Sequence, residues 1–211
     1  MRQISRQSAL LLVLGAAGTA WGGAFPWGGG GPSREPHPAT VALRDYSATV
    51  RTNLGEIELA LEPDAAPNAV RMFLKLAGRG DYDGARFQSI FKGRMAVLAA
   101  PPSQAKAEGD DTIAHEDTRL PASEGAVLMD KAADGRNSPG RLLILLGDQG
   151  HLERSYTVFA RVRKGQDVLR RIGAAATRPN DGSPAPIEDI VIEQVLVVRK
   201  QASGPEEDAK K

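Results

Sequence analysis

The stretch FQSIFKGRMAVLAAP, residues 87–101, decides how the fold of this chain is interpreted. Side chains alternate between the two faces of a strand, so a slip of one residue between Phe87 and Met95 would exchange their inward and outward positions. Whether a side chain here lies in a core or on a surface therefore depends on the register. The segment APNAVRMFLKLAGRGDYDG, residues 66–84, comes just before this stretch, separated from it by two residues.

Two segments have the apolar periodicity of a helix. In residues 64–77, apolar side chains recur at i, i+3, i+4 and i+7 starting from Val70. Asp64 is the expected N-cap, Pro67 is tolerated in the first turn, and glycines follow the last turn. Residues 166–173 carry a shorter apolar stripe of the same kind. The sequence therefore predicts one helix in each segment.

The other periodic segments indicate β-strands. In residues 56–61, the apolar side chains of Ile57, Leu59 and Leu61 alternate with other residues, which is the period of a half-buried strand. Many short strands with only two helices favour a closed barrel or a sandwich over a parallel βαβ sheet. Further strands are expected in residues 126–129, 142–146, 157–162 and 190–198.

The N-terminal residues have the pattern of a secretory signal peptide. Arg2 and Arg6 precede the apolar run of residues 9–17, and small residues up to Ala24 offer a cleavage point. The run is shorter than the about 20 apolar residues that span a bilayer. We therefore expect residues 1–24 to direct export to the periplasm or the extracellular space. The alternative is an uncleaved leader that tethers the protein to a membrane.

Composition divides the rest of the chain into three parts. Residues 25–46 are rich in Gly and Pro and are expected to form a flexible linker. Residues 47–199 carry the strand and helix signals of one domain, and residues 200–211 form a charged tail that we expect to be disordered. The formal net charge of +1 gives no reason to expect nucleic acid as a partner. The absence of cysteine excludes disulfides and thiolate metal sites.

Several segments together resemble the cyclophilins, a family of peptidyl-prolyl cis-trans isomerases. The family pattern FHRVIPGFMIQGGDP corresponds to residues 87–101, TIPDEF to TIAHED at residues 112–117, and HLDGKHTVFGRV to HLERSYTVFARV at residues 151–162. These segments follow one another in the family's order. The resemblance implies an all-β fold, namely a closed antiparallel eight-stranded barrel capped by two α-helices. It also implies a groove for proline-containing peptides on the outer face of the barrel.

In that family, the arginine that follows the histidine of the first pattern does the chemistry. An X–Pro bond isomerises slowly because amide resonance sets a barrier of about 18–20 kcal/mol. Twisting the bond localises the lone pair on the prolyl nitrogen, so a donor aimed at that nitrogen stabilises the twisted state more than the planar ones. A permanently charged arginine with its rigid donor fork suits this role.

This chain departs from the family at the positions that carry the chemistry. Ser89 stands at the position of the arginine, so the resemblance implies no retained catalytic residue and weak or absent turnover. Arg94 and Arg141 are possible substitutes if they project into the groove beside Ser89; the alternative is that both are solvated surface arginines. The positions that the resemblance places along the substrate groove are Phe87, Gln88, Ser89, Arg94, Met95, Val97, Asp130, Lys131, Arg141, Leu143, Leu152 and Tyr156.

The three histidines are not spaced as metal ligands. His37 is expected in the linker, and His115 and His151 are expected in loops, each without a partner at ligand spacing. A zinc site needs three or four converging ligands. The sequence therefore gives no reason to expect a metal or another cofactor.

Two functional hypotheses follow from the sequence. The first is a member of the isomerase family that acts on, or binds, proline-containing segments of exported proteins, as a monomer. The second is a non-catalytic scaffold that binds a peptide or protein on a cyclophilin fold. A groove lined by Arg94, Arg141, Asp130 and Lys131 would suit an acidic or mixed-charge partner and would favour the second hypothesis.

Overall fold

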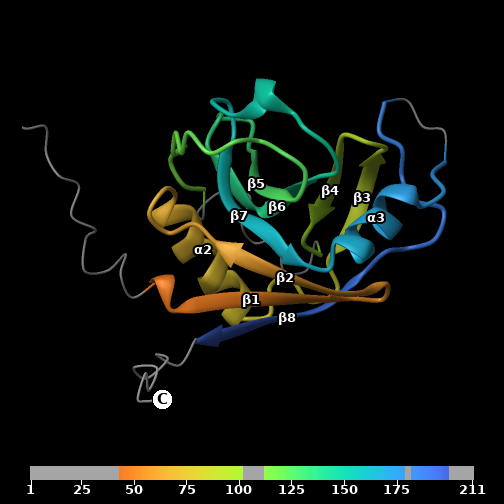
Figure 1. Cartoon of the computed structure of the whole chain (residues 1–211), viewed down its shortest axis with the longest axis horizontal. Helices are drawn as coiled ribbons and strands as arrows, with labels where there is room; N and C mark the ends of the chain where they lie inside the picture. Colours follow the sequence, from red (N-terminus) through yellow and green to blue (C-terminus); the bar gives the residue numbers. More distant parts are fainter. Residues whose placement is uncertain (1–42, 102–111, 179–181, 200–211) are drawn as a thin grey trace, which may run out of the picture. The chain divides into compact units, whose positions relative to one another are not determined.

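The computed structural model describes residues 43–101, 112–178 and 182–199 of the chain (Figure 1). The expected leader, most of the expected linker and the expected charged tail lie outside the described residues, so these remain predictions. None of the helices in the described ranges has the length and apolarity needed to cross a membrane.

The described residues form an antiparallel sheet of eight strands with two α-helices against it. The helices lie on opposite sides in Figure 1: α2 packs against β6, β7 and β8, and α3 against β2, β3 and β4. The elements in chain order are β1 (Tyr46–Thr52), β2 (Gly55–Leu61), α2 (Pro67–Gly78), β3 (Arg86–Phe91), β4 (Met95–Ala99), β5 (Ala126–Lys131), β6 (Asn137–Leu145), the 3₁₀ turn η1 (Gly150–Leu152), β7 (Thr157–Lys164), α3 (Gln166–Ala174) and β8 (Ile192–Arg199).

The sheet is curled but open, so the expected closed barrel is wrong. The strand order is β3-β4-β6-β5-β7-β2-β1-β8, which makes β3 and β8 the two edges. Within the described residues, an isolated bridge between Arg86 and Val191 takes the place of a ladder between these edges. The reason is that an irregular segment before β8 runs along β3, where Pro184 accepts a hydrogen bond from the Ile90 N–H at 2.8 Å.

The main core lies between the inner face of the sheet and the helices. Cross-strand pairs place Ile90, Ala96 and Ile144 in one inner row, and all three are buried. The ring of Phe73 on α2 lies 5.4 Å from the ring of Tyr82 and 5.3 Å from that of Phe159. Burial of each large apolar side chain contributes about 1.5–3 kcal/mol, so this core is the main source of stability.

The N-terminus of α2 is capped from a distant loop. Pro67 begins the helix as expected, but the expected N-cap Asp64 is wrong, because its carboxylate instead accepts hydrogen bonds from Arg44 at 2.6 and 2.9 Å. The carboxylate of Glu116 accepts the N–H groups of Asn68 at 3.0 Å and Ala69 at 2.9 Å. These bonds satisfy donors that the helix itself leaves open, and the negative charge suits this end of the helix dipole.

The backbone conformation directly before α3 requires a glycine at position 165. Its φ of +91° lies in the left-handed region, and a Cβ here would lie 2.4 Å from the carbonyl oxygen of Glu56. Glycine pays neither the steric penalty of that φ nor the clash. This close approach lets β7 pass directly into α3.

Candidate functional site

A β-bulge at Gln88 decides which face each residue of β3 occupies. Phe87 pairs with Leu98 and Ser89 pairs with Val97, so Gln88 is an extra residue without a cross-strand partner on β4. A bulge of this kind disrupts the alternation of side chains. Phe87 is therefore 3% exposed in the main core, whereas Ser89 lies on the outer face. The structure does not bring Phe87 to the outer face with the other predicted groove residues.

A row of cross-strand pairs runs across the outer face from Ser89. Ser89 is opposite Val97, Val97 is opposite Leu143, Leu143 is opposite Leu128, and Leu128 is opposite Val158. Residues directly opposite each other share a face of the sheet. All five are buried, with Ser89 7% exposed.

Most of the predicted apolar groove residues come together around this row. A second hydrophobic cluster, separate from the main core, contains Val97, Leu143 and Leu152, and the partly exposed side chains of Met95 and Tyr156 pack against it. We call this second cluster the outer-face cluster. The structure therefore gathers these five predicted residues, together with Ser89, on one face. The full outer-face cluster consists of Val97, Ala122, Ala126, Leu128, Leu143, Leu145, Leu152 and Val158, with Phe91, Met95, Leu120 and Tyr156 packed against it.

The predicted polar residues next to this cluster interact with one another. The guanidinium of Arg141 lies 3.0 Å from the carboxylate of Asp130, whose side chain is only 14% exposed. The ammonium group of Lys131 lies 5.3 Å from the centre of the Tyr156 ring, within the range of a cation–π contact. The charged groups at these predicted groove positions thus have partners on the protein itself.

Neither arginine considered as a substitute for the missing one lies beside Ser89. Arg94 is exposed in the turn between β3 and β4, where its carbonyl oxygen accepts the N–H of Leu146 at 2.9 Å. Arg141 is opposite Ala99 on β4, and β6 is two strands from β3. Neighbouring strands are about 4.8 Å apart, so Arg141 starts about 10 Å from Ser89 across the sheet alone.

A buried polar network supports the loops next to Tyr156. The hydroxyl of Thr157 accepts the N–H of Glu116 at 2.9 Å and the side-chain amide of Asn137 at 2.8 Å, and it donates to the Glu116 carbonyl at 3.0 Å. The ring of His115 lies 3.2 Å from the same hydroxyl and 3.1 Å from the carbonyl of Arg154. In the described part of the chain, no three His, Asp or Glu side chains converge as metal ligands. His37 lies outside the described residues.

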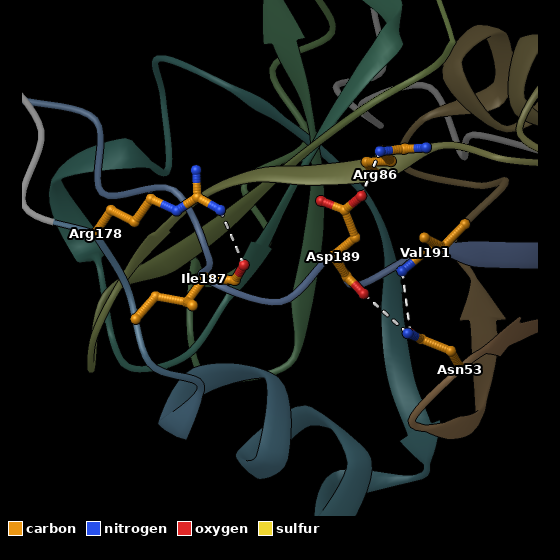
Figure 2. A network of polar contacts seen from close by, with 6 residues as sticks. All are labelled: Asn53, Arg86, Arg178, Ile187, Asp189 and Val191. Atoms are coloured by element: carbon orange, nitrogen blue, oxygen red, sulfur yellow. Dashed lines mark hydrogen bonds and ion pairs between the residues drawn. The ribbon is translucent and has the colours of Figure 1, made fainter.

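Sequence reasoning missed a cavity of about 530 Å³ at the start of β3. Its charged lining residues are Arg86, Arg178 and Asp189, shown in Figure 2. No motif marks these residues, because they come from three separate segments. The isolated bridges Arg86–Val191 and Thr177–Pro186 bring those segments together, and such non-local contacts leave no periodic signal in the sequence.

Comparisons with known proteins agree with this fold. Residues 47–197 match the family described as cyclophilin type peptidyl-prolyl cis-trans isomerase/CLD. Peptidyl-prolyl cis-trans isomerase-like 1 of Neurospora crassa is 31% identical over 157 residues, which cover 72% of this chain and 94% of that protein. A peptidyl-prolyl cis-trans isomerase of Arabidopsis thaliana is 29% identical over 163 residues, covering 74% of this chain and 72% of the relative.

Other relatives are much longer. The match to peptidyl-prolyl cis-trans isomerase-like 2 of Neurospora crassa covers 75% of this chain but only 28% of that protein. Among solved structures, a cyclophilin type isomerase of Cryptosporidium parvum, crystallised in the presence of the dipeptide Ala-Pro, superposes with a TM-score of 0.63. It is 23% identical, and the alignment covers 72% of this chain and 98% of that one.

Proposed function

Because this chain belongs to the cyclophilin-type peptidyl-prolyl cis-trans isomerase family, we propose that it binds proline-containing segments of exported proteins on the outer-face cluster, with weak or absent isomerase turnover. The observation that carries the proposal is the place of Ser89. The resemblance assigns the family's arginine to this position, and Ser89 is 7% exposed there, opposite Val97 in an apolar row.

The outer-face cluster supports binding of a proline ring. Val97, Leu143 and Leu152 form a buried apolar base, and Met95 and Tyr156 stand partly exposed against it. A proline ring is apolar and rigid, so little conformational entropy opposes its burial on such a base. Contacts of this kind do not require the missing arginine.

The polar groups on the same face support weak turnover. A serine hydroxyl is short and neutral, so it cannot supply a cationic fork to the prolyl nitrogen. Arg141 is held by Asp130 at 3.0 Å and starts two strands away. Loss of one preorganised donor of this type typically costs about 10²–10³ in kcat.

A second candidate function is a non-catalytic scaffold that binds a charged partner. The pairs Asp130–Arg141 and Lys131–Tyr156 favour it, because they put opposite charges at positions that the resemblance places along the substrate groove. A partner of mixed charge would complement this edge. The two candidates differ in whether binding requires a proline in the partner.

The leader-like sequence of residues 1–24 supports partners among exported proteins. If it is cleaved, the mature protein lacks residues up to about Ala20 or Ala24. Intact-mass measurement of the protein from a secreting host checks this. An uncleaved chain that remains with the membrane fraction would support the tethered alternative instead.

The experiment that tests the function uses the full chain and the peptide Ala-Ala-Pro-Ala, with Ala-Ala-Ala-Ala as its matched control. NMR titration measures binding, and NMR exchange measures the cis-trans rate. We expect saturable binding that depends on proline, with an exchange rate close to that of the free peptide. An exchange rate well above that of the free peptide would contradict the weak turnover. Equal binding of both peptides would favour the scaffold function.

A further inference from the structure

The cavity at the start of β3 has the size and the charged lining of a binding site. Its volume of about 530 Å³ lies within the range of about 300–1,000 Å³ that is usual for ligand pockets. Alanine and proline residues, together with Phe87 and Gln88, form most of its wall, while Arg86, Arg178 and Asp189 supply the charges. Two positive charges and one negative charge leave an excess of one positive charge in the lining.

Arg178 is held in place by both its backbone and its side chain. Its N–H donates to the carbonyl of Ala185 at 2.8 Å. Its guanidinium donates to the carbonyl of Ile187 at 3.1 Å, as Figure 2 shows. A guanidinium carries five N–H donors in a planar fork, so the bond to Ile187 uses only one of them. A fork fixed in this way loses little entropy when it binds a planar anion.

The opposite wall of the cavity is also fixed. The amide of Asn53 donates to the carbonyl of Asp189 at 2.9 Å and accepts the N–H of Val191 at 3.1 Å. The carboxylate of Asp189 pairs with Arg86, as Figure 2 shows. Both side chains are 62% exposed, and Asp189 balances the charge of Arg86, so the positive charge of Arg178 is left in excess.

The cavity adjoins the outer-face cluster. Gln88 lines the cavity and directly precedes Ser89 in the chain. Ala99 also lines it, and lies opposite both Arg86 on β3 and Arg141 on β6. This row is two residues along β4 from the row of Val97, a separation of about 7 Å. An extended peptide on the cluster would therefore reach the cavity within two or three residues.

From this arrangement, and resting on the proposed binding of proline-containing segments, we propose that the cavity is a subsite for an acidic side chain of the same bound peptide. The Arg178 guanidinium receives a Glu or Asp carboxylate two or three residues from the proline. One monoanion matches the excess positive charge of the lining. A planar carboxylate also matches the donor fork, which binds such groups through two parallel N–H···O bonds.

Fluorescence anisotropy with labelled proline peptides tests the proposal on the full chain. The peptides carry Glu or Gln at the third position before or after the proline, so that both chain directions are covered. For one of the two placements, we expect the Glu peptide to bind about tenfold more tightly than its Gln counterpart. Arg178→Gln should reduce this preference to about twofold or less, while Asp189→Asn should increase it, because it removes a competing negative charge.

Arg199→Gln is the matched control, since Arg199 is an exposed arginine paired with Asp45 and is absent from the cavity lining. It changes the net charge equally and should leave the preference for Glu unchanged. If the wild type binds Glu and Gln peptides equally but still requires proline, the subsite is overturned and the proposed function stands. If Arg178→Gln keeps the same preference for the Glu peptide as the wild type, the subsite is also overturned. If proline makes no difference to binding, the proposed function falls as well.

Discussion

Ser89 on β3 lies directly opposite Val97 on β4, and Val97 lies opposite Leu143 on β6. The position to which the resemblance assigns the family's arginine is therefore part of an apolar row on the outer face. Ser89 is 7% exposed there, so its neighbours cover most of it. A longer side chain at this position has to extend outward over the cluster.

Ser89→Arg should keep the binding of proline peptides and raise the exchange rate about tenfold over the wild type. The gain stays below the about 10²–10³ of a preorganised donor, because Val97 and Leu143 in the row of Ser89 are apolar and cannot orient the guanidinium by hydrogen bonds. NMR exchange on Ala-Ala-Pro-Ala measures the rate. Ser89→Lys is the control, since it adds a charge without a planar fork. Equal rates for both variants would show that the fork geometry is not what the site lacks.

The helices and several strands could be predicted from the sequence because their signals are local. The period from Val70 and the alternation in residues 56–61 each reflect one face of one element, and the structure has α2 and β2 there. The bulge at Gln88 could not be predicted, because it arises from how β3 pairs with β4. Local alternation alone would have put Phe87 and Ser89 on one face.

The errors and omissions also have non-local causes. Asp64 has the right residue type and place for an N-cap, but Glu116, from a loop that follows β4, supplies the helix with its acceptor. The open edge between β3 and β8 depends on the path of the segment that precedes Ile192. Arg178 becomes part of the cavity only because the folded chain brings its guanidinium to the carbonyl of Ile187. None of these contacts produces a period or a motif.

Glu116→Ala should lower the free energy of unfolding by about 1 kcal/mol, because the N–H groups of Asn68 and Ala69 lose their acceptor. Glu116→Gln should cost less, since its amide oxygen still accepts one of these bonds. Urea unfolding of the full chain measures both. Asp117→Ala is the control at an exposed neighbour and should stay within about 0.5 kcal/mol of the wild type. Equal losses for the Ala and Gln variants would contradict the capping role.

Thr157→Val should destabilise the protein by about 2–3 kcal/mol, although the two side chains have nearly the same shape. The hydroxyl of Thr157 bonds Asn137 and both backbone groups of Glu116, and all of these lose a partner together. Thermal or urea unfolding measures the loss. Thr49→Val on β1, at a partly exposed position, is the matched control and should have a small effect. Similar losses of stability at both positions would mean that a Thr→Val change in a strand is costly in itself, and that the hydrogen bonds of the Thr157 hydroxyl are not the cause.

Tyr82 should make the stability of the protein fall at alkaline pH. Burial, with a smaller contribution from the Asp81 carboxylate, raises the pKa of Tyr82 above its ordinary value of 10. Above about pH 10, the unfolded chain releases this proton while the folded protein retains it, so the free energy of unfolding falls as pH rises. Below pH 10, the contribution is fully present.

Tyr82→Phe isolates this effect. At pH 7 the variant should lose about 1 kcal/mol, because the carbonyl of Pro139 no longer accepts the hydrogen bond that Tyr82 donates at 2.7 Å. As pH rises above 10, the wild type loses the tyrosine contribution and the variant does not, so the two stability curves should converge. Urea unfolding at intervals from pH 7 to about pH 11 measures both curves. The lysines also titrate in this range, but they do so in both proteins, so their effect cancels in the comparison. Curves that stay parallel would mean that Tyr82 ionises as easily in the folded protein as in the unfolded chain.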